Sequence, residues 1–133
     1  LQWVTSKSLI DCCIGFGTTF SDPKVSIGNN VYIGSRCEIG YAEIKNNCII
    51  GSGVHLLSGQ GQHTFDNIYV PIRLQGGSFE RIIIGENCWI GNSVVIAADI
   101  GTGCVIGAGS VVVKPIPDNA IAVGNPAKVI KFR

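Results

Sequence analysis

Residues 84–96 read IGENCWIGNSVVI, and this stretch decides the fold. An aliphatic residue recurs every six positions, at Ile84, Ile90 and Ile96, and glycine follows the first two. Each hexad continues with two turn-forming residues, a small or β-branched residue in the fifth place and a variable sixth residue. A fixed short period is typical of repeat architectures. The same period runs through residues 27–40, 44–56 and 100–111.

The six-residue period predicts an all-β fold, a single-stranded left-handed parallel β-helix of triangular coils. A short strand, a turn and another short strand repeat until three hexads close one coil. The first position of each hexad should point inward and fill the centre. The fifth should also point inward, beside a corner that admits only a small side chain. Successive coils then hydrogen-bond strand to strand at a spacing of about 4.8 Å.

The cysteines follow the same pattern. Free cysteine behaves as a small hydrophobic residue and is often buried, so cysteines in the fifth position are expected to be reduced core residues. Disulfide and zinc roles are the alternatives for such a set. Cys12 and Cys13 are adjacent, so at most one of them should face inward. A thiol-rich core fits a reducing cytoplasm, where we expect the protein to be located. The fifth-position cysteines are Cys37, Cys48, Cys88 and Cys104.

Composition agrees with one repeat domain spanning residues 1–133. Gly is common, at 18 residues, and charged residues make up 14%, against about 25% in ordinary globular chains. The 46% hydrophobic content argues against disorder, and the glycine content suggests many tight corners. The net charge of +1 gives no argument for nucleic acid binding, and no apolar run approaches the roughly 20 residues of a membrane span. No signal peptide is apparent, and a start at Leu1 leaves open a missing N-terminal piece.

The hexads stop between about residues 58 and 80, and this interruption is expected to be functional. A long loop inside a compact repeat is uncommon, and solenoid insertions collect on one face, often the binding face. The loop carries His63, for which a solvated surface histidine is the alternative interpretation. Asp66 could orient the His63 ring or cap a turn, and the turn role is favoured. The other histidine, His55, occupies an outward sixth position and is expected at the surface.

Three characteristic sequence motifs follow the loop histidine, in this order: IGENCWIG (84–91), IGAGSVVVK (106–114) and GNPAKVIK (124–131). In this combination the chain resembles the hexapeptide-repeat, or isoleucine-patch, acyltransferases, and within them the sugar and polysaccharide O-acetyltransferases. The resemblance covers nearly all of the chain from about Ile14. It implies that the prolines after Lys114 close the helix, so that residues 115–133 form a C-terminal cap.

The resemblance implies an acetyl-CoA-dependent O-acetyltransferase. Acetyl-CoA would be the acyl donor, and a hydroxyl of a sugar or polysaccharide precursor would attack its thioester directly, without an acyl-enzyme and without a metal. His63 would be the general base that removes the hydroxyl proton. Many relatives carry two loop histidines. Counted back from Pro71, His63 matches the second and Gly61 replaces the first, whereas counted forward from Leu56, Gln60 and Gln62 fall at the two positions, so the loop contains an insertion or deletion. Acceptors that remain open are an amino-sugar nitrogen and a small xenobiotic such as an antibiotic.

The resemblance also implies how acetyl-CoA binds. Asn92 would lie along the pantetheine arm, and Ala108 and Val113 would offer it backbone groups. Trp89 would face outward as a subunit contact and a wall of the active site. A homotrimer with each site between two subunits is implied, with no nucleic acid partner and no membrane span. The basic residues at the matching positions are Lys114, with Lys128 and Lys131 for the nucleotide phosphates, and the alternative for the last two is a solubilising tail.

Two other classes of protein are alternatives for a β-helix of this kind. A carbonic anhydrase on the same β-helix needs three histidines around zinc, and this chain has two. A non-catalytic scaffold, whose loop contacts a partner, fits the fold but not the three C-terminal stretches. For the acceptor pocket, the first coils and the loop supply the candidates. These are Phe16, Phe20, Tyr32, Arg36 and Tyr41.

Overall fold

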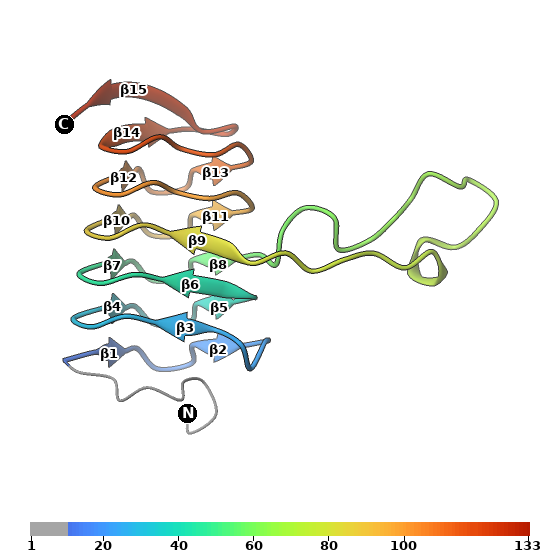
Figure 1. Cartoon of the computed structure of the whole chain (residues 1–133), viewed down its shortest axis with the longest axis horizontal. Coiled ribbons are helices and arrows are strands. Elements are labelled where there is room, and N and C mark those ends of the chain that lie inside the picture. The colour runs from blue at the N-terminus through green and yellow to red at the C-terminus, as the bar shows by residue number, and fades with distance from the viewer. Residues whose placement is uncertain (1–10) are drawn as a thin grey trace.

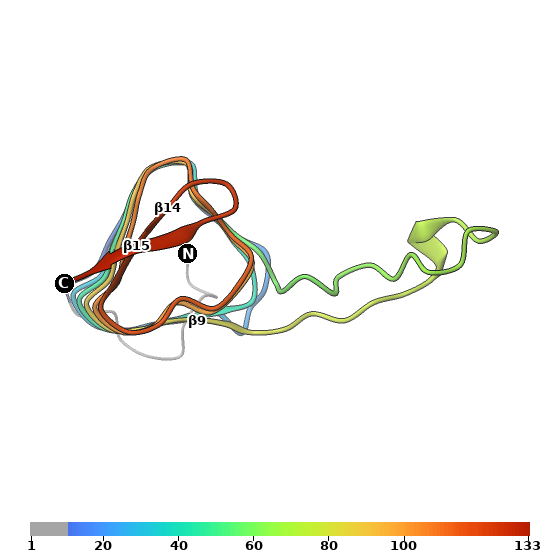
Figure 2. The same cartoon turned by 90° about the horizontal axis from the view of Figure 1, so that it is seen from above.

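The computed structural model describes residues 11–133. The chain winds as a left-handed parallel β-helix whose coils stack into a three-sided prism (Figures 1 and 2), which confirms the predicted fold class. A long arm leaves one edge of the prism and returns to it. Within the described residues, no helix has the length and apolar character that crossing a membrane requires.

Three sheets form the faces of the prism, and neighbouring coils pair in parallel. Face 1 contains β1 (Cys13–Ile14), β4 (Tyr32–Ile33), β7 (Ile49–Ile50), β10 (Trp89–Ile90), β12 (Val105–Ile106) and β14 (Ala120–Val123), and β15 (Lys128–Phe132) follows it. Face 2 contains β2 (Thr19–Phe20), β5 (Glu38–Ile39), β8 (His55–Leu56), β11 (Val95–Ile96) and β13 (Val111–Val112). Face 3 contains β3 (Ser26–Ile27), β6 (Ala42–Ile44) and β9 (Ile82–Ile84), and bridges at Ile100 and Ile116 continue it.

The turns between faces depend on the fourth position of each hexad. This position has a left-handed backbone, with φ between 54° and 76°, which glycine and asparagine adopt at low cost. A side-chain oxygen in the turn then accepts a hydrogen bond from the main-chain N–H of the coil before it. Asn46 Oδ1 accepts from Asn29 N at 2.8 Å, and Asp118 Oδ1 accepts from Thr102 N at 2.8 Å. The turn residues therefore satisfy backbone groups that the short strands leave unpaired.

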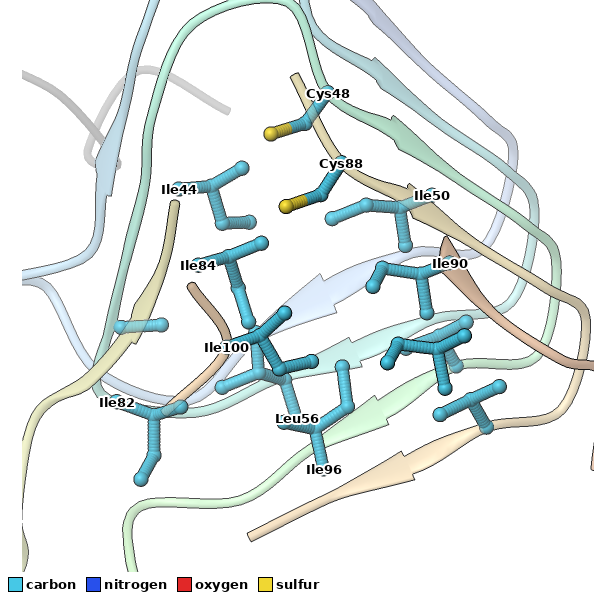
Figure 3. Packing of buried hydrophobic residues seen from close by; sticks show 14 of the residues in the cluster. Ile44, Cys48, Ile50, Leu56, Ile82, Ile84, Cys88, Ile90, Ile96 and Ile100 are labelled. Carbon is cyan, nitrogen blue, oxygen red and sulfur yellow. The ribbon is translucent and has the colours of Figure 1, made fainter. Parts of the chain in front are cut away.

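The first hexad positions form the core, as predicted. Ile44, Ile84 and Ile100 stack along face 3, and Ile50 and Ile90 stack along face 1 (Figure 3). Each of these five side chains is at most 2% exposed. Burying one such side chain contributes about 1.5–3 kcal/mol, so the isoleucine columns provide most of the driving force that holds the coils together.

The four fifth-position cysteines are buried free thiols, which confirms that interpretation. Each donates its S–H to a carbonyl in the next coil: Cys48 to Gly85 at 3.1 Å, for example, and Cys104 to Pro117 at 3.1 Å. Burial raises the pKa of the Cys104 thiol. Of the adjacent pair, Cys12 packs against the core and Cys13 is exposed, which confirms that at most one faces inward.

The raised pKa of Cys104 predicts an alkaline loss of stability. The folded state keeps this thiol protonated, while the unfolded thiol ionises above about pH 8.5. Its contribution is therefore fully present below that pH and declines above it, by at most about 1.4 kcal/mol per pH unit, until the raised pKa of the folded thiol is reached. Cys104→Val, which places valine in a slot that other hexads fill with valine, should flatten this decline between pH 8 and 10. Urea unfolding at several pH values measures it, and equal slopes for parent and variant would contradict it.

The end of the prism is covered by β15, which runs antiparallel to β14 and lies across the last coil (Figure 2). The turn that precedes β15 is held against face 2, because Ala127 N donates to Val111 O at 2.8 Å. At the opposite end of β15, Arg133 Nη1 donates to Gly103 O at 2.9 Å.

Candidate functional site

The interrupted segment forms an arm of two halves that lie side by side, and it projects from the edge between faces 2 and 3 (Figure 2). Its two halves are joined by main-chain hydrogen bonds, from Glu80 N to Ser58 O at 2.9 Å and from Ser78 N to Gly61 O at 2.8 Å. They approach so closely at Gly77 that a Cβ there would collide with the Gln62 carbonyl. The arm is therefore an ordered projection rather than a loop lying on the prism.

Gln60 fixes the root of the arm to the edge between faces 2 and 3. Its Nε2 donates to Val113 O at 2.7 Å and to Ala97 O at 3.2 Å, in two successive coils. A cleft of about 260 Å³ opens beside this contact, between the arm root and the coil edge. The carbonyl of Val113, a residue that the resemblance implies for the pantetheine arm, thus accepts a hydrogen bond from Gln60 in this structure.

His63 lies on the outgoing half of the arm, three residues beyond Gln60, and its side chain is exposed. No side chain within residues 11–133 hydrogen-bonds to its imidazole. Asp66 neither orients this ring nor caps the turn, so the expected turn role was wrong. Asn67 has that role instead, because its Oδ1 accepts from Tyr69 N at 2.9 Å and its main chain is bonded by Gln75. Among the described residues, the His63 imidazole is therefore exposed and makes no side-chain hydrogen bond.

Asn92 and Ala108 come together at the edge between faces 1 and 2, in neighbouring coils. Gly109 N donates to Asn92 O at 2.9 Å, and both predicted residues are exposed. Asn92 also has a structural role, because its Oδ1 accepts from Ser52 N at 2.9 Å. Its Nδ2 donors and the edge beside Ala108 remain available to a ligand.

The other predicted cofactor residues lie apart from this pair. Val113 and exposed Lys114 are at the opposite edge of face 2, beside the arm root. Ala108 and Val113 are five positions apart in the chain, so an extended chain places them up to about 17 Å apart. Lys128 and Lys131 are exposed on β15, opposite Val123 and Ile121. The residues predicted to bind acetyl-CoA therefore form two clusters in one chain, one at each edge of face 2. The lysines of β15 lie apart from both, at the end of the prism.

Trp89 points outward from face 1 and is 58% exposed, as the sixth-position pattern predicts. It belongs to an apolar stripe that runs up this face through residues in register from coil to coil. Contiguous exposed apolar surface of this kind marks interaction sites. The stripe consists of Cys13, Tyr32, Ile49, Trp89, Val105 and Ile121.

The tip of the arm is a second exposed apolar surface. Around the short 3₁₀ helix η1 (Ile72–Leu74), large apolar side chains face solvent, and Ile68 and Tyr69 are 85% and 90% exposed. None of them packs on the prism of the same chain, since the tip lies far from it (Figure 1). The apolar tip consists of Phe65, Ile68, Tyr69, Ile72 and Leu74.

The five residues suggested for the acceptor pocket do not form one cluster, although Phe16 and Arg36 meet at one corner, where Arg36 N donates to Phe16 O at 3.0 Å. Phe20 packs against the core, and Tyr32 belongs to the face 1 stripe. Phe16 is 89% exposed at a corner, and Tyr41 lies beneath Lys24, whose Nζ is 5.5 Å from the ring centroid. The hexad pattern could not show which of these residues lie near one another, because it distinguishes inward from outward positions but does not distinguish one face of the prism from another.

Two features of this region were missed from the sequence. One is the Gln60 contact, which has no signal in a repeat pattern. The other is a pair formed by His55 Nδ1 and Glu38 Oε2, 3.6 Å apart on face 2. The two residues are 17 positions apart, one fewer than three full hexads, so the period alone does not place them opposite each other. Within residues 11–133, no group of three or more His, Cys, Asp or Glu side chains could hold a metal ion.

Comparisons with known proteins agree with this architecture. A Saccharomyces cerevisiae protein named as an acetyltransferase is 38% identical over 111 residues, which cover 78% of this chain and 57% of the relative. A maltose O-acetyltransferase from Clostridium difficile superposes with a TM-score of 0.80 at 32% identity, over 91% of this chain and 66% of that one. A galactoside acetyltransferase in complex with coenzyme A gives 0.74 at 31% identity, over 92% and 65%.

Among relatives from yeasts, a mycobacterium and a staphylococcus, the chain spans 36% to 64% of their length. The family model described as the hexapeptide repeat of succinyl-transferase matches residues 24–58 and 81–114, which flank the arm and make up just over half of the chain. With its coils, its left-handed turns and its isoleucine columns, the chain belongs to the hexapeptide-repeat acyltransferase family.

Proposed function

We propose that this protein transfers an acetyl group from acetyl-CoA to a hydroxyl of a sugar or polysaccharide precursor. The observation that carries the proposal is the arm, which holds His63 exposed and unpartnered beyond a root tied to the Val113 edge. The similar solved structures named as maltose and galactoside acetyltransferases, one of them bound to coenzyme A, support the donor and the class of acceptor.

In this reaction His63 acts as the general base. The acceptor oxygen attacks the thioester carbonyl carbon as the His63 imidazole takes its proton, which is typical work for histidine near neutral pH. A C–O bond forms, the tetrahedral intermediate collapses and the C–S bond breaks. The proton then passes to the CoA thiolate. No cysteine is needed as a nucleophile, and the four core thiols are buried and bonded to carbonyls.

The donor would bind along the two edges of face 2. The Nδ2 of Asn92 and the backbone at Ala108 would contact the pantetheine arm, and Lys128 and Lys131 would meet the nucleotide phosphates. The hydrogen bond from Ser52 N to Asn92 Oδ1 holds the Asn92 amide in one orientation. This preorganises its Nδ2 donors and so favours binding of the pantetheine arm. At the other edge, a pantetheine that bonds to Val113 O must displace the Gln60 amide, with Lys114 beside it.

The active unit is proposed to be a homotrimer with each site between two subunits. The apolar tip of the arm and the apolar stripe of face 1, with Trp89, are different surfaces of one chain. A contact between different surfaces is heterologous, and it closes into a cyclic assembly when the rotation permits. Contact between the apolar tip and the apolar stripe would remove from solvent the largest exposed apolar regions described above. The free buried thiols fit the expected cytoplasmic location.

Acetyl-CoA binding followed by thiol release tests the function. Calorimetry should detect acetyl-CoA binding, and release of CoA should depend on an added sugar such as maltose or methyl β-galactoside. Faster release with glucosamine, or with an aminoglycoside, would favour the N-acetyl or xenobiotic alternative. Absence of acetyl-CoA binding would overturn the enzyme proposal and favour the scaffold.

A further inference from the structure

A small groove lies on face 2, directly beside the root of the arm. It crosses β2, β5 and β8, which stack in order below the arm (Figure 1), and its volume is about 220 Å³. This is below the range of about 300–1,000 Å³ that is usual for drug-sized ligands, so the groove suits a single ring. The polar residues along it are Thr19, Ser21, Glu38, His55, Ser58 and Gln62.

The centre of the groove is a ladder of three outward side chains in register. Thr19 pairs with Glu38 across β2 and β5, and Glu38 pairs with His55 across β5 and β8. His55 Nδ1 lies 3.6 Å from Glu38 Oε2, and the two side chains are 46% and 70% exposed. A pair that is this exposed contributes little to folding, so stability does not explain it. When Nδ1–H faces the carboxylate, the neutral ring keeps Nε2 as an acceptor.

The groove therefore combines donors and acceptors in a small space. The Thr19 hydroxyl can donate or accept, the Glu38 carboxylate accepts, and His55 can do either. The apolar lining of the groove is the half-buried Leu57, while Ile39 and Leu56 belong to the core and contribute their main chain. Several hydroxyls on one ring with apolar C–H faces match this combination, whereas an anion would be repelled by Glu38.

The groove also reaches the arm that carries the proposed base. Gln62, whose Nε2 donates to Gly59 O at 3.1 Å, forms the wall on the arm side, and His63 is the next residue. We propose that this groove binds the acceptor sugar ring, with the Glu38–His55 pair holding its hydroxyls. This assignment rests on the proposed acetyl transfer and adds His55 and Glu38 as residues that determine acceptor specificity.

Acceptor kinetics with His55→Gln and Glu38→Gln test this role. Each variant should raise KM for maltose or methyl β-galactoside by about 10- to 100-fold, because a hydrogen bond to a charged or polar partner is lost. The KM for acetyl-CoA and kcat should stay within about two-fold. Glu43→Gln, which removes the carboxylate of the 3.3 Å pair with Arg81 on face 3, is the control and should leave every constant unchanged. An unchanged acceptor KM, or a fall in kcat at constant KM, would overturn the proposal.

Binding measured without turnover separates this proposal from the proposed function. The two histidines give separate imidazole NMR signals, assigned by their loss in His55→Gln and His63→Ala. Either sugar should shift the His55 signal at millimolar concentration, even in a protein that releases no CoA. Such a shift without thiol release would support the groove and contradict the acetyl transfer. If neither sugar moves the His55 signal, the groove is not the acceptor site.

Discussion

His63→Ala is expected to lower kcat for acetyl transfer by about 10²- to 10⁴-fold, the usual contribution of a positioned general base. Without the imidazole, the acceptor hydroxyl must attack while still protonated. The affinity for acetyl-CoA should not change, since the residues proposed to bind the donor lie at the edges of face 2 and not on the arm. Single-turnover thiol release measures the first quantity, and calorimetry measures the second.

Asp66→Ala is the matched control for His63. It removes a side chain three residues away on the same arm that hydrogen-bonds neither to His63 nor to the turn, so kcat should stay within about three-fold of the parent. Folding should be preserved in both variants, because both side chains are exposed. Equal rates of CoA release from parent and His63→Ala would show that another group is the base.

Ile68→Asp is expected to dissociate the trimer and abolish most of the activity. Ile68 is 85% exposed in the single chain, so the substitution leaves the prism intact. In an assembly that buries the arm tip, it removes about 1.5–3 kcal/mol of apolar burial and adds a desolvated charge. Association should weaken by about 10²-fold or more. Sedimentation equilibrium measures this, and a parent that sediments as a monomer would contradict the trimer.

Two further experiments sharpen that result. Ser78→Asp adds the same charge on the return half of the arm, away from the apolar tip, and should leave the trimer intact. Mixing His63→Ala with Asn92→Ala, a variant altered at the proposed donor site, tests whether subunits share sites. Hybrid trimers should regain activity if the base and the donor residues of one site come from different chains. No recovery after subunit exchange would place both in one chain.

The long extruded loop predicted from the missing hexads is present, and the structure adds that its two halves are paired. The missing hexads indicated a functional projection with His63, but hydrogen bonds between its two halves hold it straight, and these depend on close approach at Gly77. The Gln60 contact could not be predicted, because its partners Ala97 and Val113 are 37 and 53 residues away. The donor residues implied by the resemblance remain a prediction, and the structure adds that Asn92 and Ala108 lie at one edge of face 2 and Val113 and Lys114 at the other.

The sequence by itself determined the inward columns, the buried cysteines and the left-handed turns, because each follows from position within a hexad. Only the tertiary structure decided which side chains stand opposite one another. Hexads alone would give 18 residues per coil, but Ile27 pairs with Ile44, Ile44 with Ile84 and Ile84 with Ile100. The coil length varies because the segment that joins face 2 to face 3 is shorter than a hexad in some coils, and in one coil it is extended into the arm. Glu38 stands opposite His55 because of this variation in coil length. The variation is set by main-chain pairing between coils, which a local six-residue period does not specify.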